Sequence, residues 1–236
     1  MNADSTAFLV PSTTRNRNWS CIEETYLYTT LLRTLDKSCP DTDICVFVGY
    51  DRNDPIYSKD EERMKMNAIF MKFRIQWIPF TPDPGNVVAV WNKLFDLSYQ
   101  EGFEWFKILG DDIRLPNDPG WLKLFQKQLK KQKYIGWAAG YSNNTEIATQ
   151  FLIHRTHYQI FEFVFPPQIR NWFCDNWLHN IYPQKYRYWR QDYPLLNTGG
   201  EPRYQPENHG ALCAMLLRRH KKGLHKFLND MEKIKN

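Results

Sequence analysis

Two adjacent carboxylates, Asp111 and Asp112, follow a short apolar run at residues 105–109. An apolar run of this length predicts a buried strand, and open α/β sheets bind their ligands at the carboxyl ends of the strands. A pair of acids at that edge can hold a divalent cation through hard oxygen ligands, and the cation can neutralise a bound diphosphate. Gly-Asp-Asp is also good turn chemistry, so a solvated turn is the alternative interpretation.

The first 140 residues alternate between apolar runs and amphipathic segments. Strands are predicted at residues 7–11, 43–49, 73–79, 105–109 and 134–139, and helices from about Trp19 and at 61–72, 87–100 and 118–133. This alternation indicates a mostly parallel sheet flanked by helices. Neither GxGxxG after the first strand nor GxxxxGK[ST] is present, which argues against ordinary dehydrogenases and phosphate-loop NTPases.

The second half has a different character. A strand is predicted at 149–154, a short helix at 155–161, a helix at 171–182, a strand at 186–190, a tight turn at 197–200 and a long helix from about Glu207. Leu224, Phe227, Leu228 and Met231 share one face of the last helix, which we expect to dock against the sheet. The expected organisation is one domain over 1–236, with a core half at 1–140 and an elaboration with the C-terminal helix at 141–236.

Composition narrows the class of protein. A formal charge of +5 over 236 residues is too small and too dispersed for a nucleic-acid binder. The five cysteines form no CxxC pair, so reduced thiols in a cytoplasmic, soluble protein are expected. No signal peptide is visible, and no apolar run approaches the roughly 18 to 20 residues of a membrane helix. The sequence leaves open that the chain is one domain of a longer polypeptide.

Six segments in a fixed order resemble nucleotide-sugar-dependent glycosyltransferases of the glycosyltransferase-A fold, especially the family-2-like group. The segments are Val10-Pro-Ser-Thr-Thr-Arg15, Gly49-Tyr-Asp-Arg-Asn-Asp-Pro55, Trp91-Asn-Lys-Leu94, Gly110-Asp-Asp112, the stretch from Phe165-Pro-Pro to Asn171-Trp-Phe-Cys-Asp-Asn-Trp177, and the stretch from Asn197-Thr-Gly-Gly to Pro202-Arg-Tyr204. The layout is also similar to glycosyltransferases encoded by large algal viruses and marine eukaryotes, which would place the protein in a host cytoplasm. The resemblance covers roughly residues 7–215.

The resemblance implies a metal site that uses Mn²⁺ or Mg²⁺. Asp112 would ligate the cation, and Asp111 would lie near the ribose or the water shell of the metal. His209 matches the late histidine that often adds a further metal ligand; a capping or surface role is the alternative. The acidic motif of the family is usually Asp-x-Asp, whereas Gly110 occupies its first position here.

The resemblance also implies a nucleotide site. Asp51 would accept the imide N–H of a uracil base, and Thr13 and Arg15 would frame the nucleotide, because a guanidinium suits bidentate phosphate contacts. Lys93 or Asn92 could reach the base or the diphosphate. Arg203 would contact the diphosphate. For each of these side chains, a solvated position in a turn, loop or helix surface is the alternative.

Asp175 is the candidate general base. Inverting sugar transfer needs a carboxylate that deprotonates the attacking hydroxyl, and partial burial raises the pKa of a carboxylate towards a useful value. Trp172 and Trp177 flank Asp175, and their rings could stack on sugar faces. The alternative is an acid that is favoured at a helix N-terminus by the macrodipole.

The resulting expectation is a metal-dependent hexosyl- or pentosyltransferase. It would move a sugar from a nucleoside diphosphate donor, UDP above all, to a hydroxyl of an oligosaccharide or glycan acceptor, with inversion; retention stays open. Two alternatives remain. A sugar nucleotidyltransferase would usually carry a glycine-rich first loop, and residues 12–18 contain no glycine. A non-catalytic carbohydrate-binding domain of the same fold is consistent with the incomplete acidic motif.

Overall fold

A computed structural model describes residues 4–39, 43–199 and 205–233. A seven-stranded sheet runs through its centre in the order β3-β2-β1-β4-β7-β6-β8. The strands are β1 (Thr6–Pro11), β2 (Ile44–Asp51), β3 (Arg74–Phe80), β4 (Trp105–Ile108), β6 (Trp137–Tyr141), β7 (Leu152–His154) and β8 (Arg187–Pro194). Only β7 runs antiparallel to its neighbours in this sheet, so the mostly parallel sheet expected from the sequence is confirmed. A separate antiparallel pair joins β5 (Ile113–Arg114) to β9 (Leu196–Asn197).

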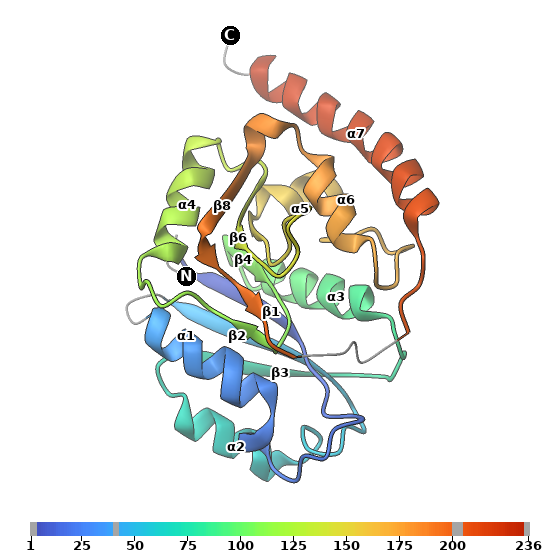
Figure 1. The fold of residues 1–236 in the computed structure, drawn as a ribbon. Helices are drawn as coiled ribbons and strands as arrows, with labels where there is room; N and C mark the ends of the chain where they lie inside the picture. The colour runs from blue at the N-terminus through green and yellow to red at the C-terminus, as the bar shows by residue number, and fades with distance from the viewer. Residues whose placement is uncertain (1–3, 40–42, 200–204, 234–236) are drawn as a thin grey trace.

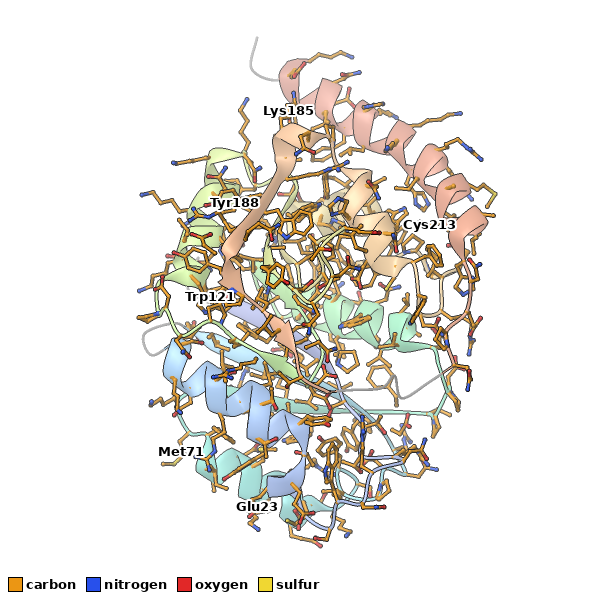
Figure 2. All side chains as sticks on the ribbon, in the orientation of Figure 1. Glu23, Met71, Trp121, Lys185, Tyr188 and Cys213 are labelled. Carbon is orange, nitrogen blue, oxygen red and sulfur yellow. The ribbon has the colours of Figure 1, made fainter. Side chains whose placement is uncertain are left out.

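Helices cover both faces of the sheet (Figure 1). They are α1 (Arg33–Ser38), α2 (Asp60–Ile69), α3 (Val87–Gln100), α4 (Trp121–Lys131), α5 (Thr156–Phe161), α6 (Cys174–Ile181) and α7 (Gly210–Lys233). The alternation of side chains along β1 divides the core, because Phe8 and Val10 face α1, α2 and α4 while Ala7 and Leu9 face α3 and α6. Figure 2 shows Trp121 at the start of α4, and this ring is fully buried against the first of these two clusters.

Two helix expectations need correction. The helix expected from about Trp19 begins as a 3₁₀ turn at Ile22–Glu24 and a π-helical turn at Leu27–Leu32, and it becomes regular only at Arg33. The C-terminal helix α7 packs on α6 and α5 instead of the sheet, because these helices and α3 already cover that face. Cys213 lies on the inner side of α7 (Figure 2), and its thiol donates to the backbone oxygen of Phe173 at 3.6 Å. No described helix has the length and apolar character needed to cross a membrane.

Helix α3 locks the carboxyl ends of three neighbouring strands together. The indole Nε1 of Trp91 donates to the backbone oxygens of Leu9 and Leu109, at 3.3 and 3.4 Å. Val90 packs so closely on β2 that a Cβ at Gly49 would lie 2.4 Å from its Cγ1. The absence of a side chain at Gly49 therefore lets α3 approach the sheet edge where the candidate residues gather.

A buried carboxylate, Asp54, holds the loops after β1 and β2 against each other. It accepts hydrogen bonds from the hydroxyl and backbone N–H of Thr14 at 2.5 and 2.8 Å and from the hydroxyl of Thr13 at 3.1 Å. It also accepts from the backbone N–H groups of Ile56 and Tyr57, at 3.1 and 2.9 Å. Because one carboxylate accepts hydrogen bonds from five donors in two loops, it fixes the distance between those loops.

Replacing Gly136 by alanine should destabilise the protein by about 2 to 4 kcal/mol, from left-handed backbone strain and overpacking together. Gly136 has φ +98°, and a Cβ there would lie 1.8 Å from the backbone oxygen of Tyr186, just before β8. Gly102 has φ +87°, and no described atom lies within 4 Å of the added carbon, so Gly102→Ala should cost only about 1 kcal/mol. Chemical denaturation of both variants measures the difference, and equal losses would show that the contact with Tyr186 is unimportant.

Replacing Asp54 by asparagine should cost about 2 to 4 kcal/mol, because an amide NH₂ would then face donors that lose their acceptor. Asp118 is a control with fewer donors, since its exposed carboxylate accepts from Gly120 N at 2.7 Å and from the hydroxyl of Tyr193. Asp118→Asn should change the free energy of unfolding by no more than about 0.5 kcal/mol. A similar small loss for both variants in urea denaturation would contradict the role given to Asp54.

Candidate functional site

A pocket of about 560 Å³ opens at the carboxyl ends of β1 and β2. Its walls come from the end of β1 and the loop after it, the end of β2, the start of α3 and the segment before α7: Pro11, Ser12, Thr13, Arg15, Asn16, Gly49, Tyr50, Asp51, Asp83, Pro84, Gly85, Asn86, Val87, Val90, Gln205 and Glu207. Thr13, Arg15 and Asp51, three of the residues expected at a nucleotide site, therefore line one pocket. A second hollow of about 470 Å³, at the opposite ends of β2 and β3, contains none of the candidate residues.

Arg15 and Asp51 form an ion pair on the pocket wall, with 3.0 Å between Nε and Oδ2. The guanidinium also donates to the backbone oxygen of Asn53 at 3.2 Å. Both side chains keep part of their surface exposed. A carboxylate in this position can accept an N–H from a ligand, while the ion pair with Arg15 orients it.

Asp111 is fully buried and faces the interior beneath the loop after β1. Its Oδ2 accepts from the hydroxyl of Ser12 at 2.5 Å, and Ser12 Oγ lies 2.9 Å from the hydroxyl of Tyr57. Burial, and then the neighbouring Asp111 carboxylate, raise the pKa of Tyr57, so the phenol keeps its proton and can donate to Ser12. Asp111 therefore contacts the pocket wall through Ser12.

Asp112 is partly exposed, and its backbone oxygen accepts from the N–H and hydroxyl of Thr198 at 3.0 and 3.1 Å. Two glycines border its carboxylate. A Cβ would lie 2.0 Å from Oδ2 if placed on Gly199, and 2.7 Å from Oδ1 if placed on Gly110. The absence of a side chain at Gly110 and Gly199 therefore lets the backbone approach the Asp112 carboxylate closely.

The donor set near Asp112 fits a cation that is shared with a ligand. Within the described ranges, no three His, Cys, Asp or Glu side chains converge on one point. Mg²⁺ bound beside phosphates typically takes one or two carboxylates and completes its shell with phosphate oxygens and water. A single hard carboxylate bordered by two glycines is consistent with that arrangement.

His209 lies beside the pocket wall at the start of α7. Its Nε2 is 3.4 Å from Oε2 of Glu207, which lines the pocket. This nitrogen is buried and makes no hydrogen bond to any described residue. A metal-ligand role for His209 stays a prediction, since the described residues provide no trio that includes it and Asp112. Arg203 lies outside the described residues.

The two candidates on α3 lie away from the pocket surface. Lys93 is exposed and pairs with Asp96 at 3.5 Å, one turn along the helix, and it is not among the lining residues. Asn92 has a structural role, because its Oδ1 accepts from the N–H groups of Val164 and Phe165, both at 3.0 Å. The first turns of α3 line the pocket instead, through Asn86, Val87 and Val90.

The loop before α6 binds the outer wall of the pocket through Arg170 and Asn171. The sequence did not predict this role for either residue. Arg170 pairs with Asp83 at 2.9 Å and with Glu207 at 3.2 Å. The buried side chain of Asn171 donates to Gly85 O at 2.8 Å and accepts from Glu207 N at 3.0 Å. Two adjacent residues thus join segments more than 80 positions apart, and no local sequence pattern marks such a contact.

Asp175 lies in the first turn of α6, four residues after Asn171. It is half-buried, and no hydrogen bond or ion pair reaches its carboxylate from the described part of the chain. Burial raises the pKa of Asp175 from 3.8 to about 7. A carboxylate with such a pKa can accept a proton near neutral pH.

The two tryptophans beside Asp175 have different environments. Trp172 is 48% exposed and can still meet a ligand, whereas Trp177 is fully buried and packs against Phe161 and Phe163. The expectation that Trp177 could stack on a sugar is therefore wrong, because the inner face of a short amphipathic helix supplies the core.

Comparison with solved structures shows where this fold recurs. TarS residues 1–349 of S. aureus superimposes with a TM-score of 0.53 at 12% identity over 83% of this chain and 60% of that one. The mannosyltransferase PcManGT from Pyrobaculum calidifontis, in complex with GDP-Man and Mn²⁺, superimposes with a TM-score of 0.56 at 12% identity. The match covers 85% of this chain and 58% of PcManGT. A cytidylyltransferase from Leptospira borgpetersenii superimposes with a TM-score of 0.50 at 13% identity. The match covers 84% of this chain and 82% of the cytidylyltransferase.

The chain spans about 60% of the length of the first two of these proteins. No protein-family model and no curated sequence matches it. Identities near 12% establish the architecture alone, so the similarity to viral proteins stays a prediction. The chain therefore has the mostly parallel α/β fold that a mannosyltransferase and a cytidylyltransferase share, which confirms the fold expected from the resemblance.

Proposed function

We propose that the protein transfers a sugar from a nucleoside diphosphate donor, most consistently a UDP-sugar, to a hydroxyl of a saccharide acceptor. The observation that carries this proposal is the pocket at the carboxyl ends of β1 and β2, where Thr13, Arg15 and Asp51 gather. Ser12 links this pocket to the strand that ends in Asp111 and Asp112. Ligands of open α/β sheets bind at this edge.

In this proposal the pocket receives the nucleoside and Asp112 lies on the diphosphate side. Asp51 accepts an N–H of the base, and Arg15 orients Asp51 through their ion pair. A divalent cation held by Asp112 would supply Lewis-acid stabilisation of the departing diphosphate. His209 stays a proposed metal ligand, and Arg203 a proposed contact of the diphosphate. Lys93 stays a proposed donor-site residue, and in this structure its ammonium pairs with Asp96 at 3.5 Å.

In the proposed reaction, Asp175 accepts the proton of the acceptor hydroxyl. An acceptor hydroxyl oxygen forms a bond to the anomeric carbon, the bond from that carbon to the phosphate oxygen breaks, and the nucleoside diphosphate leaves with the bonding pair. The hydroxyl proton passes to the Asp175 carboxylate. Attack from the face opposite the leaving group inverts the anomeric centre. The raised pKa of Asp175, and the lack of a partner for its carboxylate among the described residues, support this role.

The two halves of the chain divide these tasks in the proposal. Residues 1–140 supply most of the donor pocket, and residues 141–236 supply Asp175 and the exposed Trp172, which could contact a glycan. The clamp of Arg170 and Asn171 joins the halves at the pocket rim.

Nucleotidyl transfer is a second candidate, favoured by the likeness to the cytidylyltransferase along most of both chains. The two reactions release different products. A glycosyltransferase releases a nucleoside diphosphate from a sugar nucleotide, whereas a nucleotidyltransferase releases pyrophosphate from a nucleoside triphosphate. The absence of glycine from residues 12–18 favours sugar transfer.

A thermal-shift screen against UDP, GDP, CDP and ADP, each with and without Mn²⁺, should show one nucleotide that raises the melting temperature with the metal. Binding at a hundred times the dissociation constant stabilises the native state by about 2.7 kcal/mol, which is readily measured. Asp112→Ala should remove the metal-dependent part of the shift, and Asp118→Ala, on the exposed loop before α4, should retain it.

Product analysis separates the candidates. Release of nucleoside diphosphate from the matching sugar nucleotide supports sugar transfer, and release of pyrophosphate from a triphosphate with a sugar phosphate supports nucleotidyl transfer. Absence of a shift with all four nucleotides would contradict both and favour a carbohydrate-binding domain.

Asp175→Asn should lower kcat by about 10²- to 10⁴-fold and yet stabilise the protein above neutral pH. With a pKa of about 7 in the native state and 3.8 as the ordinary value, native Asp175 holds a proton that the unfolded chain has lost. The unfolding free energy of the wild type therefore falls as pH rises from about 4 to about 7, and the variant lacks this fall.

Denaturation of both proteins across this pH range measures the effect. Asp192→Asn is the control, since the hydrogen bond from Arg190 lowers the pKa of Asp192, so the contribution of this carboxylate to stability is lost only as pH falls towards and below the ordinary value of 3.8. The stability difference from wild type should stay flat for Asp192→Asn and grow with pH for Asp175→Asn. A flat difference for both would rule out the raised pKa.

A further inference from the structure

Arg17, in the loop after β1, has an unusual environment for an arginine. Its guanidinium carbon lies 5.8 Å from the ring centroid of Trp19 and 5.2 Å from that of Tyr26. Its Nη2 donates to the backbone oxygen of Gly199 at 3.2 Å. Its Nε is buried and has no hydrogen-bond partner in the described part of the chain.

No carboxylate pairs with Arg17 among residues 4–39, 43–199 and 205–233. This distinguishes it from the arginines at the pocket, because Arg15 pairs with Asp51, and Arg170 with Asp83 and Glu207. The cations of the pocket wall are thus neutralised by its own acids. A partly desolvated guanidinium with an open donor is costly without an anion, and its planar fork suits phosphate oxygens.

The contact with Gly199 brings Arg17 to the same residue as Asp112. The Gly199 carbonyl accepts from Arg17, while the Gly199 Cα faces the Asp112 carboxylate so closely that a Cβ would lie 2.0 Å from Oδ2. A cationic and an anionic side chain therefore meet at one glycine, next to the loop that forms the pocket wall. A diphosphate has oxygens for both a guanidinium and a carboxylate-bound cation.

We propose that Arg17, together with Gly199, forms a phosphate-binding subsite that holds the diphosphate of the ligand beside Asp112. This inference rests on the proposed function for the identity of the ligand, but its chemistry requires only a phosphate group. The nucleoside occupies the pocket, where Arg15 is already paired, and the phosphates extend to Arg17, which has no acidic partner within the part of the chain that the structure describes.

The alternative role for Arg17 is structural. As a structural pin, Arg17 would only hold the loop after β1 against the turn at Gly199, through its hydrogen bond to the Gly199 oxygen. A pin affects all ligands of the pocket and the stability of the fold, whereas a phosphate-binding side chain affects only ligands that carry phosphate. Arg33 offers a matched control, because its guanidinium lies 4.9 Å from the Tyr28 ring centroid and donates to Tyr28 Oη at 2.8 Å on the exposed surface of α1.

The test is titration calorimetry of inorganic pyrophosphate, UDP and uridine, each with Mg²⁺, against wild type, Arg17→Ala, Arg17→Lys and Arg33→Ala. Arg17→Ala should weaken pyrophosphate and UDP about 10-fold or more and leave uridine within about 2-fold, as expected for one lost charge-assisted hydrogen bond. Arg17→Lys should recover part of the phosphate affinity, since it keeps the charge and loses the fork. Arg33→Ala should match wild type with all three ligands.

Other outcomes overturn the inference. Equal loss of UDP and uridine affinity, with a lower melting temperature in Arg17→Ala, identifies a structural pin. Unchanged pyrophosphate and UDP affinity in a folded Arg17→Ala excludes phosphate binding there. Binding of pyrophosphate that depends on Arg17, without binding of any nucleoside diphosphate, would retain the subsite and contradict the proposed function. A wild type that binds none of the phosphate ligands would contradict both.

Discussion

The Asp54 carboxylate is the constraint on which the candidate site depends. A parallel sheet aligns the ends of β1 and β2, but it does not determine where the loops beyond them go. Five donors from residues 13, 14, 56 and 57 converge on this one buried group. A buried carboxylate needs such donors, and the loops that supply them become fixed. The pocket wall around Thr13, Arg15 and Asp51 is a consequence of that bond network.

The remaining elements close the site around this fixed corner. Trp91 joins the ends of β1 and β4 from the side of α3, and Ser12 carries a hydrogen bond from the pocket wall to Asp111. Arg170 and Asn171 then attach the second half of the chain to the rim. The charged side chains fall into two groups. The acids of the pocket are paired with arginines, while Arg17 and Asp175 have no partner of opposite charge among the described residues. Unpaired groups of this kind are where a ligand or a proton gains most.

The differences between expectation and structure have local physical causes. Trp177 lies on the apolar face of α6 and belongs to the core, although its aromatic ring and its neighbour Asp175 suggested a sugar contact. Lys93 shares a helix with Val87 and Val90, yet a helix turns by 100° per residue and directs Lys93 to solvent, where Asp96 meets it. Helix α7 packs on α5 and α6, because other helices already cover that face of the sheet. In each case the sequence indicated the type of side chain but not the direction in which it points in the folded protein.

Sequence alone determined the alternation of strands and helices, the carboxyl-end positions of Asp51, Asp111 and Asp112, and the absence of glycine-rich phosphate loops. These features depend on periodicity and on neighbours along the chain, which local physics governs. Tertiary structure alone decided that Asp111 faces inward to Ser12, that Arg170 reaches Asp83 and Glu207, and that Arg17 meets Gly199. Those contacts join residues from 37 to 182 positions apart, and only the packing of the whole sheet and its helices brings them together.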